Sequence, residues 1–318
     1  DKSVVNESIS PSMIFAFGGA AKTVQPDPQT MGTKGANLVE MAAIGLPVPP
    51  GFIINTGVGK QIASGADGMD DKLRGQISAA LGAMEATLGR HFGGDELPLL
   101  LSARSSAAVS MPGMMDTVLN IGLNATTVDA LARETGDPRF AWDSYRRFVQ
   151  NFSQVVLDLD GSDFEFVLDE VRAQHHVDTD AELSADALRE LTSIYLDIVH
   201  EQTEAPFPED VNEQLDLAMT AVFSSWNTAR ARRFRDIQSH DHDAGTAAVV
   251  QAMVFGNRDQ RSCTGVYFTR NPSTGERRPY GEYMPNAQGE DVVSGIRTPM
   301  ELTDAARVSA MSDNPSME

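Results

Sequence analysis

The spacing of hydrophobic positions changes along the chain, from a mixed pattern at the start to a helical pattern in the middle and a β pattern at the end. Residues 70–92 carry apolar side chains at helical spacing, which predicts an amphipathic helix. Residues 126–235 follow helical spacing almost throughout. Residues 247–254 and 265–269 instead alternate small and β-branched side chains, which is typical of strands. This order of segments predicts an α+β protein.

One short strand in the first part of the chain leads to a candidate anion site. An apolar run of strand length, residues 99–101, precedes Arg104 and a stretch of small residues at 102 and 105–108. We expect these small residues to form a loop whose backbone lies close to the surface. An arginine at a strand end suits a polyphosphate, because the guanidinium is a planar fork of donors that stays charged. The alternative is an arginine beside an ordinary Ser-rich loop.

Two further polar residues are candidates for the same kind of site. Lys34 lies in a glycine-rich stretch just ahead of a predicted helix, where backbone amides and a lysine together can hold an anion. The spacing is not that of a Walker loop, and a lysine flanked by glycines usually faces solvent. Gln251 lies inside a predicted strand, where it could bind a ligand edge or simply face solvent at the edge of the sheet.

Composition narrows the possible partners. The chain has 318 residues, which favours two or three subdomains, and a formal net charge of −20. That charge opposes binding to nucleic acid or to an anionic membrane, so neither is expected as a partner. It does not exclude ATP, which needs only a local cluster of donors and a divalent metal. The single cysteine, Cys263, indicates a reducing compartment.

Other chemistry-bearing residues give weaker signals. The chain has no Cys and His spacing typical of a zinc site, and a metal at His240 and His242 is a minor alternative. Four arginines follow one another at the end of a predicted helix, where the helix dipole favours cations. These arginines are Arg230, Arg232, Arg233 and Arg235. Their interpretation as dipole partners is preferred to a phosphate site.

Eight blocks of this sequence resemble, in order, the start of pyruvate phosphate dikinase. They are residues 32–38, 45–52, 110–117, 143–148, 251–257, 268–276, 286–293 and 296–299. Blocks of this length in this order are far more specific than a single glycine-rich motif. The chain is therefore similar to the nucleotide-binding part of that family.

The resemblance implies an ATP-grasp-like nucleotide-binding fold with a mostly helical inserted subdomain. The expected borders are 1–125 for the first subdomain, continuing in 210–245, then 126–209 for the helical insert and 246–318 for a second, β-rich subdomain. In this family ATP, phosphate and pyruvate become AMP, diphosphate and phosphoenolpyruvate. The phosphoryl group passes through a histidine on a separate domain.

The resemblance also assigns residues to the ATP site. Lys34 and Arg104 match the family's catalytic, phosphate-binding lysine and arginine, while Gly113, Thr117 and Gln251 match further positions around the nucleotide. Mg²⁺ is expected with ATP, although the family's acidic metal ligands lie beyond residue 318, so no metal ligand is assigned here. The expected partners are ATP and the phosphohistidine and pyruvate-binding domains. A homodimer and a cytoplasmic location are also expected.

Two departures from the family pattern leave an alternative open. The family usually has glycine at the positions of Thr33 and Cys263, and a β-carbon at either one restricts the backbone of a phosphate-covering loop. The alternative function is a truncated, non-catalytic nucleotide-binding or interaction module.

Overall fold

The chain folds into two compact units, residues 1–253 and 254–318, which are considered separately below. The computed structural model describes residues 12–22, 24–65, 69–294, 298–309 and 316. Both units combine helices with antiparallel strands, which confirms the predicted α+β class and agrees with the ATP-grasp-like expectation.

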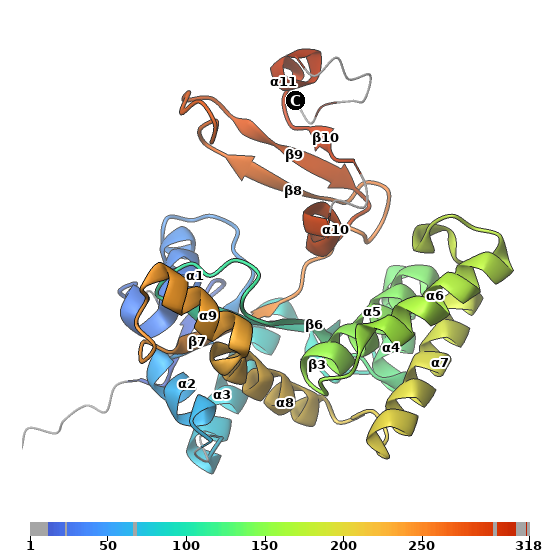
Figure 1. Cartoon of the computed structure of the whole chain (residues 1–318), viewed down its shortest axis with the longest axis horizontal. Helices are drawn as coiled ribbons and strands as arrows, with labels where there is room; N and C mark the ends of the chain where they lie inside the picture. The colour runs from blue at the N-terminus through green and yellow to red at the C-terminus, as the bar shows by residue number, and fades with distance from the viewer. Residues whose placement is uncertain (1–11, 23, 66–68, 295–297, 310–315, 317–318) are drawn as a thin grey trace, which may run out of the picture. The chain divides into compact units, whose positions relative to one another are not determined.

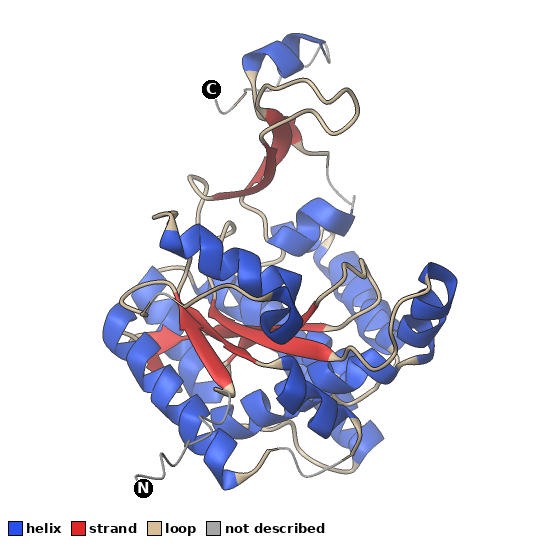
Figure 2. Cartoon of the chain, turned by 90° about the vertical axis from the view of Figure 1, so that its left-hand side faces the viewer, coloured by secondary structure: helices blue, strands red, loops and turns tan. Residues whose placement is uncertain are grey.

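A five-stranded antiparallel sheet forms the centre of the first unit, with strand order β1-β2-β7-β5-β6. Helices lie on both sides of this sheet (Figure 2). The strands are β1 (Ile14–Phe17), β2 (Gly51–Ile54), β7 (Thr246–Ala252), β5 (Leu101–Ala107) and β6 (Thr117–Ile121). All seven residues of β7 are buried, because β7 lies between two neighbouring strands and under helices.

The helices of the first unit cover the sheet with their apolar faces. α1 contacts β5 and β7, and its residues Met31, Ala36 and Val39 join Ile53 and Val249 in one hydrophobic cluster. α2 packs on β7, and α8 packs on β5, β6 and β7. The bounds are α1 (Pro28–Ala43), α2 (Thr56–Ala63), α3 (Asp71–Leu88), α8 (Val211–Ser224) and α9 (Ala229–Gln238). A short 3-10 turn, η2 (Ser225–Asn227), joins α8 to α9, and β3 (His91–Phe92) pairs in parallel with β4 (Pro98–Leu99).

The middle of the chain is helical, as predicted (Figure 1). Its elements are α4 (Ala125–Thr135), α5 (Pro138–Val155), α6 (Gly161–His175), η1 (Asp180–Glu182) and α7 (Ala185–Thr203). Buried aromatic rings hold this part together, with Phe148, Phe152 and Phe207 in mutual edge contacts. A buried ion-pair network joins Asp143 to Arg146 and Arg147 within α5.

The second unit contains a three-stranded antiparallel sheet of order β10-β9-β8. Its elements are β8 (Cys263–Phe268), β9 (Tyr280–Pro285), α10 (Gly289–Ser294), β10 (Met300–Glu301) and α11 (Asp304–Ser309). The predicted strand at 265–269 therefore corresponds to β8. Among the described residues, no helix is both long enough and apolar enough to span a membrane.

Two sequence-based expectations about the first unit need correction. The Ser-rich stretch after Leu101 is not a surface loop but part of β5, and Ser102, Ser105 and Ser106 are buried. Small side chains fit there because β5 is paired on both edges and covered by helices. Gln251 is not at a solvent-facing sheet edge either, since it is 5% exposed on β7.

The subdomain borders remain a prediction, but β7 bears on them. The strand begins at Thr246, which the expected borders assign to the second subdomain. In the structure β7 pairs with β2 and β5 of the first unit, so the compact units divide between Met253 and Val254.

Candidate functional site

Three strands place candidate site residues on one face of the five-stranded sheet. Directly opposed residues of antiparallel strands project to the same face, as do residues two apart on one strand. Arg104 on β5 lies opposite Thr117 on β6, and Ser102 on β5 lies opposite Gln251 on β7. The face therefore presents Arg104, Thr117 and Gln251 together, and Ser106 shares it.

Arg104 is the one exposed residue in an otherwise buried strand, and it lies in the middle of β5 rather than at its end. Its Nη2 donates to Gln251 Oε1 at 3.4 Å, and its Nε donates to Ser102 Oγ at 3.4 Å. These partners are neutral. The surrounding protein removes part of the hydration of the guanidinium, and this desolvation lowers the pKa of Arg104 from its ordinary value.

Lys34 reaches the same place from α1. The helix is broken at Gly32, whose backbone has φ 68° and ψ 166°, and Lys34 follows two residues later. Its Nζ donates to the backbone oxygen of Ser105 at 3.3 Å. Ser105 is the residue that follows Arg104 in the chain. The pKa of Lys34 is lowered, first by desolvation and then by the positive charge of Arg104.

The two cations lack a carboxylate partner. Within the part of the chain that the structure describes, neither Lys34 nor Arg104 forms an ion pair. Most of the ion pairs that do occur there join another arginine to an acid. The positive charge of Arg104 lowers the pKa of Lys34, and the two cations together produce a locally positive potential in a protein of net charge −20. Such a site is electrostatically prepared for an anion.

Gln251 is fixed by its other end. Its Nε2 donates to the backbone oxygen of Pro49 at 2.9 Å, which leaves Oε1 turned toward Arg104. Ser102 Oγ in turn donates to the backbone oxygen of Gln251 at 3.4 Å. The amide therefore orients the guanidinium without neutralising it.

Gly113 lies in the loop that joins β5 to β6. It has φ 70°, in a turn where the amide of Met114 donates to the oxygen of Met111, and a β-carbon there would meet no atom within 4 Å. The end of the loop is anchored on the 225–238 segment, because Asp116 forms an ion pair with Arg230 and its amide donates to Ser225 Oγ. Thr117 then begins β6 opposite Arg104.

Comparison with known proteins gives this geometry a context. Residues 67–313 match the family model described as "Pyruvate phosphate dikinase, AMP/ATP-binding domain". The chain belongs to the pyruvate phosphate dikinase family. It is 49% identical to "Pyruvate, phosphate dikinase" of Rhizobium meliloti (strain 1021), over 96% of this chain and 34% of that protein.

Pyruvate phosphate dikinases from other organisms match this chain to a similar extent. The chain is 49% identical to "Pyruvate, phosphate dikinase 2" of Oryza sativa subsp. japonica, over 91% of this chain and 32% of the relative. It is 46% identical to "Pyruvate, phosphate dikinase" of Clostridium symbiosum, over 86% of this chain and 31% of the relative. The chain thus spans about a third of the length of these dikinases.

The described residues contain no complete set of protein ligands for a metal ion. Mg²⁺ prefers oxygen ligands in an octahedral arrangement. No group of three or more His, Cys, Asp or Glu side chains that could hold a metal ion occurs among the residues described. His242 contacts Asp236 through Nε2 at 3.0 Å, within a surface cluster. No step of the chemistry proposed below is assigned to a metal held by this chain.

The four arginines of α9 have separate roles. Arg230 pairs with Asp116, as described above. Arg235 is fully buried, lies 4.0 Å from the centre of the Trp226 ring and donates to the Trp226 oxygen at 2.7 Å. Arg232 and Arg233 are exposed. Arg230 therefore supports the loop before β6, whereas Arg235 packs against Trp226 in the interior.

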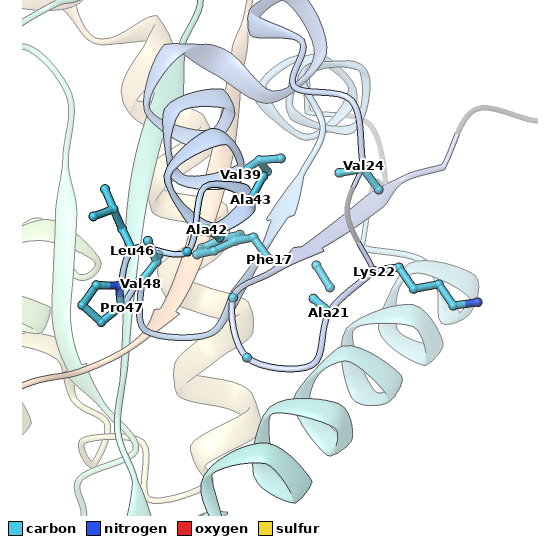
Figure 3. A pocket seen from close by; sticks show the side chains of 14 residues that line it. Phe17, Ala21, Lys22, Val24, Val39, Ala42, Ala43, Leu46, Pro47 and Val48 are labelled. Carbon is cyan, nitrogen blue, oxygen red and sulfur yellow. The ribbon is translucent and has the colours of Figure 1, made fainter.

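A separate pocket of about 280 Å³ lies at the end of β1 (Figure 3). It is lined mainly by apolar side chains, among them Phe17, Val39 and Val48, and by the glycines that follow β1. None of the five candidate site residues lines it. This pocket is therefore distinct from the Lys34–Arg104 pair.

Sequence reasoning missed the hydroxyls that hold the pair in place. Ser106 Oγ contacts two backbone groups of α1, and Thr33 Oγ1 donates to the oxygen of Ala108 at 2.7 Å. The clustering of serines after Arg104 was visible in the sequence, but it indicated a loop. The alternation of polar side chains at 102, 104 and 106 on one face of a strand was the available signal.

Proposed function

We propose that this chain is the ATP-binding part of a phosphotransferase of the pyruvate phosphate dikinase type. The observation that carries the proposal is the convergence of Lys34 and Arg104 without a carboxylate partner among the described residues. A bound triphosphate would supply the missing negative charge, and its oxygens would accept the donors that both cations leave toward solvent. Gln251 would keep the guanidinium oriented.

The roles follow from the chemistry of phosphoryl transfer, in which catalysis is mostly positioning and charge neutralisation. Arg104 offers two parallel donors to a phosphate, while Lys34 acts as a compact point charge. Thr117 lies on the same face and can add a hydroxyl contact. The turn at Gly113 leaves its backbone open for close approach of a nucleotide.

The complete reaction belongs to the proposal as well. The family's chemistry converts ATP, phosphate and pyruvate into AMP, diphosphate and phosphoenolpyruvate, through a phosphohistidine carried by another domain. We propose that this chain supplies the ATP site and acts with such phosphohistidine and pyruvate-binding domains, with Mg²⁺ accompanying ATP. A cytoplasmic location and a homodimer remain predictions, and several plant relatives carry the word "chloroplastic" in their names.

Calorimetric titration with ATP tests the proposal. The wild-type chain should bind ATP, and Arg104→Ala and Lys34→Ala should each weaken binding by at least about tenfold, because each removes a charge-assisted contact. The matched controls are Arg133→Ala on α4 and Lys72→Ala on α3, which remove exposed cations and should leave affinity within about twofold. Equal affinity in all four variants would remove the pair from the site.

A further inference from the structure

A side chain from β5 completes the hydrogen bonding of α1 at its break. In a regular α-helix the amide of Gly35 would donate to the oxygen of Met31, four residues earlier. Here the hydroxyl of Ser106 stands between these groups. It accepts from Gly35 N at 2.9 Å and donates to Met31 O at 2.9 Å. A side chain inserted into the helical ladder in this way is one of the recognised causes of a kink.

Burial and close contacts fix the position of Ser106. The residue is completely buried, and its amide donates to Thr246 Oγ1 at 3.1 Å on the neighbouring strand. A β-carbon on Gly32 would lie 1.8 Å from the backbone oxygen of Ser106, so only glycine permits this approach of helix and strand. The hydroxyl is therefore held at a fixed place in the break.

This contact determines where Lys34 lies. Lys34 lies between Gly32, where the helix comes close to β5, and Gly35, whose amide donates to Ser106 Oγ. Its Nζ donates to the oxygen of Ser105, the neighbour of Ser106. Arg104 lies two residues before Ser106 on the same face of β5. One buried hydroxyl thus links the backbone that carries the lysine to the strand that carries the arginine.

We propose that Ser106 is a positioning residue that sets the separation of Lys34 and Arg104 for phosphate binding. The proposal rests on the proposed function, since it concerns the same anion site. Without the hydroxyl, Gly35 N and Met31 O lose their shared partner in a buried place, where unpaired backbone groups are costly. The turn carrying Lys34 must then shift to pair them, and the lysine moves relative to the arginine.

The test compares Ser106→Ala with Ser105→Ala in the full chain. Ser105 is also buried on β5 but projects to the opposite face, so its variant is a matched control. Calorimetry with ATP should show about tenfold weaker binding for Ser106→Ala and a change within twofold for Ser105→Ala. Thermal unfolding followed by circular dichroism shows whether both variants fold.

A second measurement follows Lys34 without ATP. The chain has five lysines, at positions 2, 22, 34, 60 and 72, so NMR of ¹³C-dimethylated lysines gives few signals. The signal that Lys34→Arg removes is that of Lys34. Ser106→Ala should change the pKa of Lys34, because desolvation and the charge of Arg104, the two causes of its shift, both depend on where the amine lies. Ser105→Ala should leave it unchanged.

The outcomes separate the two proposals. A wild-type chain that does not bind ATP rejects the proposed function. A Ser106→Ala chain that keeps wild-type affinity, or that loses affinity while the pKa of Lys34 stays the same, overturns the positioning role. If Ser106→Ala does not fold, Ser106→Cys replaces it with the same expectations, since a thiol has nearly the same shape and is only a weak donor.

Discussion

Arg104 on β5 and Gln251 on β7 meet across two neighbouring strands, where Arg104 Nη2 donates to Gln251 Oε1 at 3.4 Å. Gln251 is opposite Ser102 in the register, so the arginine leans along its own strand to reach it. The other end of the amide is tied to Pro49 O at 2.9 Å. A neutral acceptor therefore orients the guanidinium and leaves its charge for a ligand.

Replacing this acceptor with a carboxylic acid should weaken ATP binding by occupying the donors of Arg104. Gln251→Glu places a carboxylate beside Arg104, which forms a charge-assisted pair and competes with phosphate for the same donors. We expect ATP affinity to fall by about tenfold or more, and to fall less in Gln251→Ala, because alanine only loosens the arginine. Calorimetry measures both. Equal losses in the two variants would contradict competition by the new charge.

Removing the amine of Lys34 should stabilise the fold while it weakens binding. Desolvation and the charge of Arg104 lower the pKa of Lys34 below its ordinary value of 10.5, so protonated Lys34 costs folding free energy at neutral pH. Because Lys34 is partly exposed, Lys34→Met should raise the free energy of unfolding by only about 0.5 kcal/mol at pH 7. Urea unfolding measures the change, with Lys72→Met on α3 as the control.

The size of the stability gain from Lys34→Met depends on pH. Below the lowered pKa of Lys34 the folded protein carries the full cost of the charge, and that cost disappears as the pH rises through the interval up to 10.5. The gain from Lys34→Met should therefore shrink steadily as the pH approaches 10.5. A gain that grows with pH would refute the assigned cause.

The ion-pair network of α5 gives a prediction in the acid range. Burial acts to raise the pKa of Asp143, but the charges of Arg146 and Arg147 outweigh it and lower that pKa to about 2, against 3.8 in the unfolded chain. Asp143→Asn removes the buried carboxylate from Arg146 and Arg147, which still have the more exposed Asp180 as a partner, and should lower the free energy of unfolding by about 3 kcal/mol at pH 7. Glu170→Gln on the exposed face of α6 is the control.

The pKa of Asp143 determines the pH range in which this network stabilises the fold. Because the folded pKa of Asp143 is depressed, its contribution is fully present above pH 3.8 and is lost as the pH falls through about 2. The difference in free energy of unfolding between wild type and Asp143→Asn should become smaller as the pH falls from 3.8 to about 2. Unfolding by urea at a series of pH values measures it, and a constant difference down to pH 2 would speak against the network.

Two glycine substitutions should act in opposite directions. Gly32→Ala brings a β-carbon to 1.8 Å from Ser106 O at φ 68°, so it should destabilise the chain by about 3 kcal/mol or more. Gly82→Ala lies in the exposed interior of α3 with no atom within 4 Å, so it should stabilise by about 0.5–1 kcal/mol. Thermal and urea unfolding compare them. Similar effects of both would rule out the close approach at Gly32.

The sequence predicted elements better than their surroundings. Hydrophobic periodicity was enough for α3, for the helical middle and for β7 and β8, because these segments carry strong patterns. It failed for Ser102, Ser105 and Ser106, since small polar residues favour loops until tertiary contacts supply partners. Burial of Gln251 likewise depends on β7 lying between β2 and β5, a non-local pairing that no local pattern encodes.

The candidate site shows the same division. Lys34 and Arg104 were identifiable from residue type and family resemblance, yet their proximity depends on a contact 71 residues apart in the chain. For Ser106 the alternation of polar residues at 102, 104 and 106 was the available signal, but a serine in a run of small residues also fits a loop. Its role is visible only when the break at Gly32 and the strand are seen together.

The order of the five-stranded sheet has a consequence for how the chain acquires its structure. β7 lies between β2 and β5, yet it is the last of these strands to leave the ribosome. Until it arrives, β2 and β5 each expose an unpaired edge, and such edges favour aggregation and slow the search for long-range pairings. The nascent chain therefore carries two unpaired strand edges until β7 has left the ribosome, and a chaperone that covers them would protect the chain during this interval.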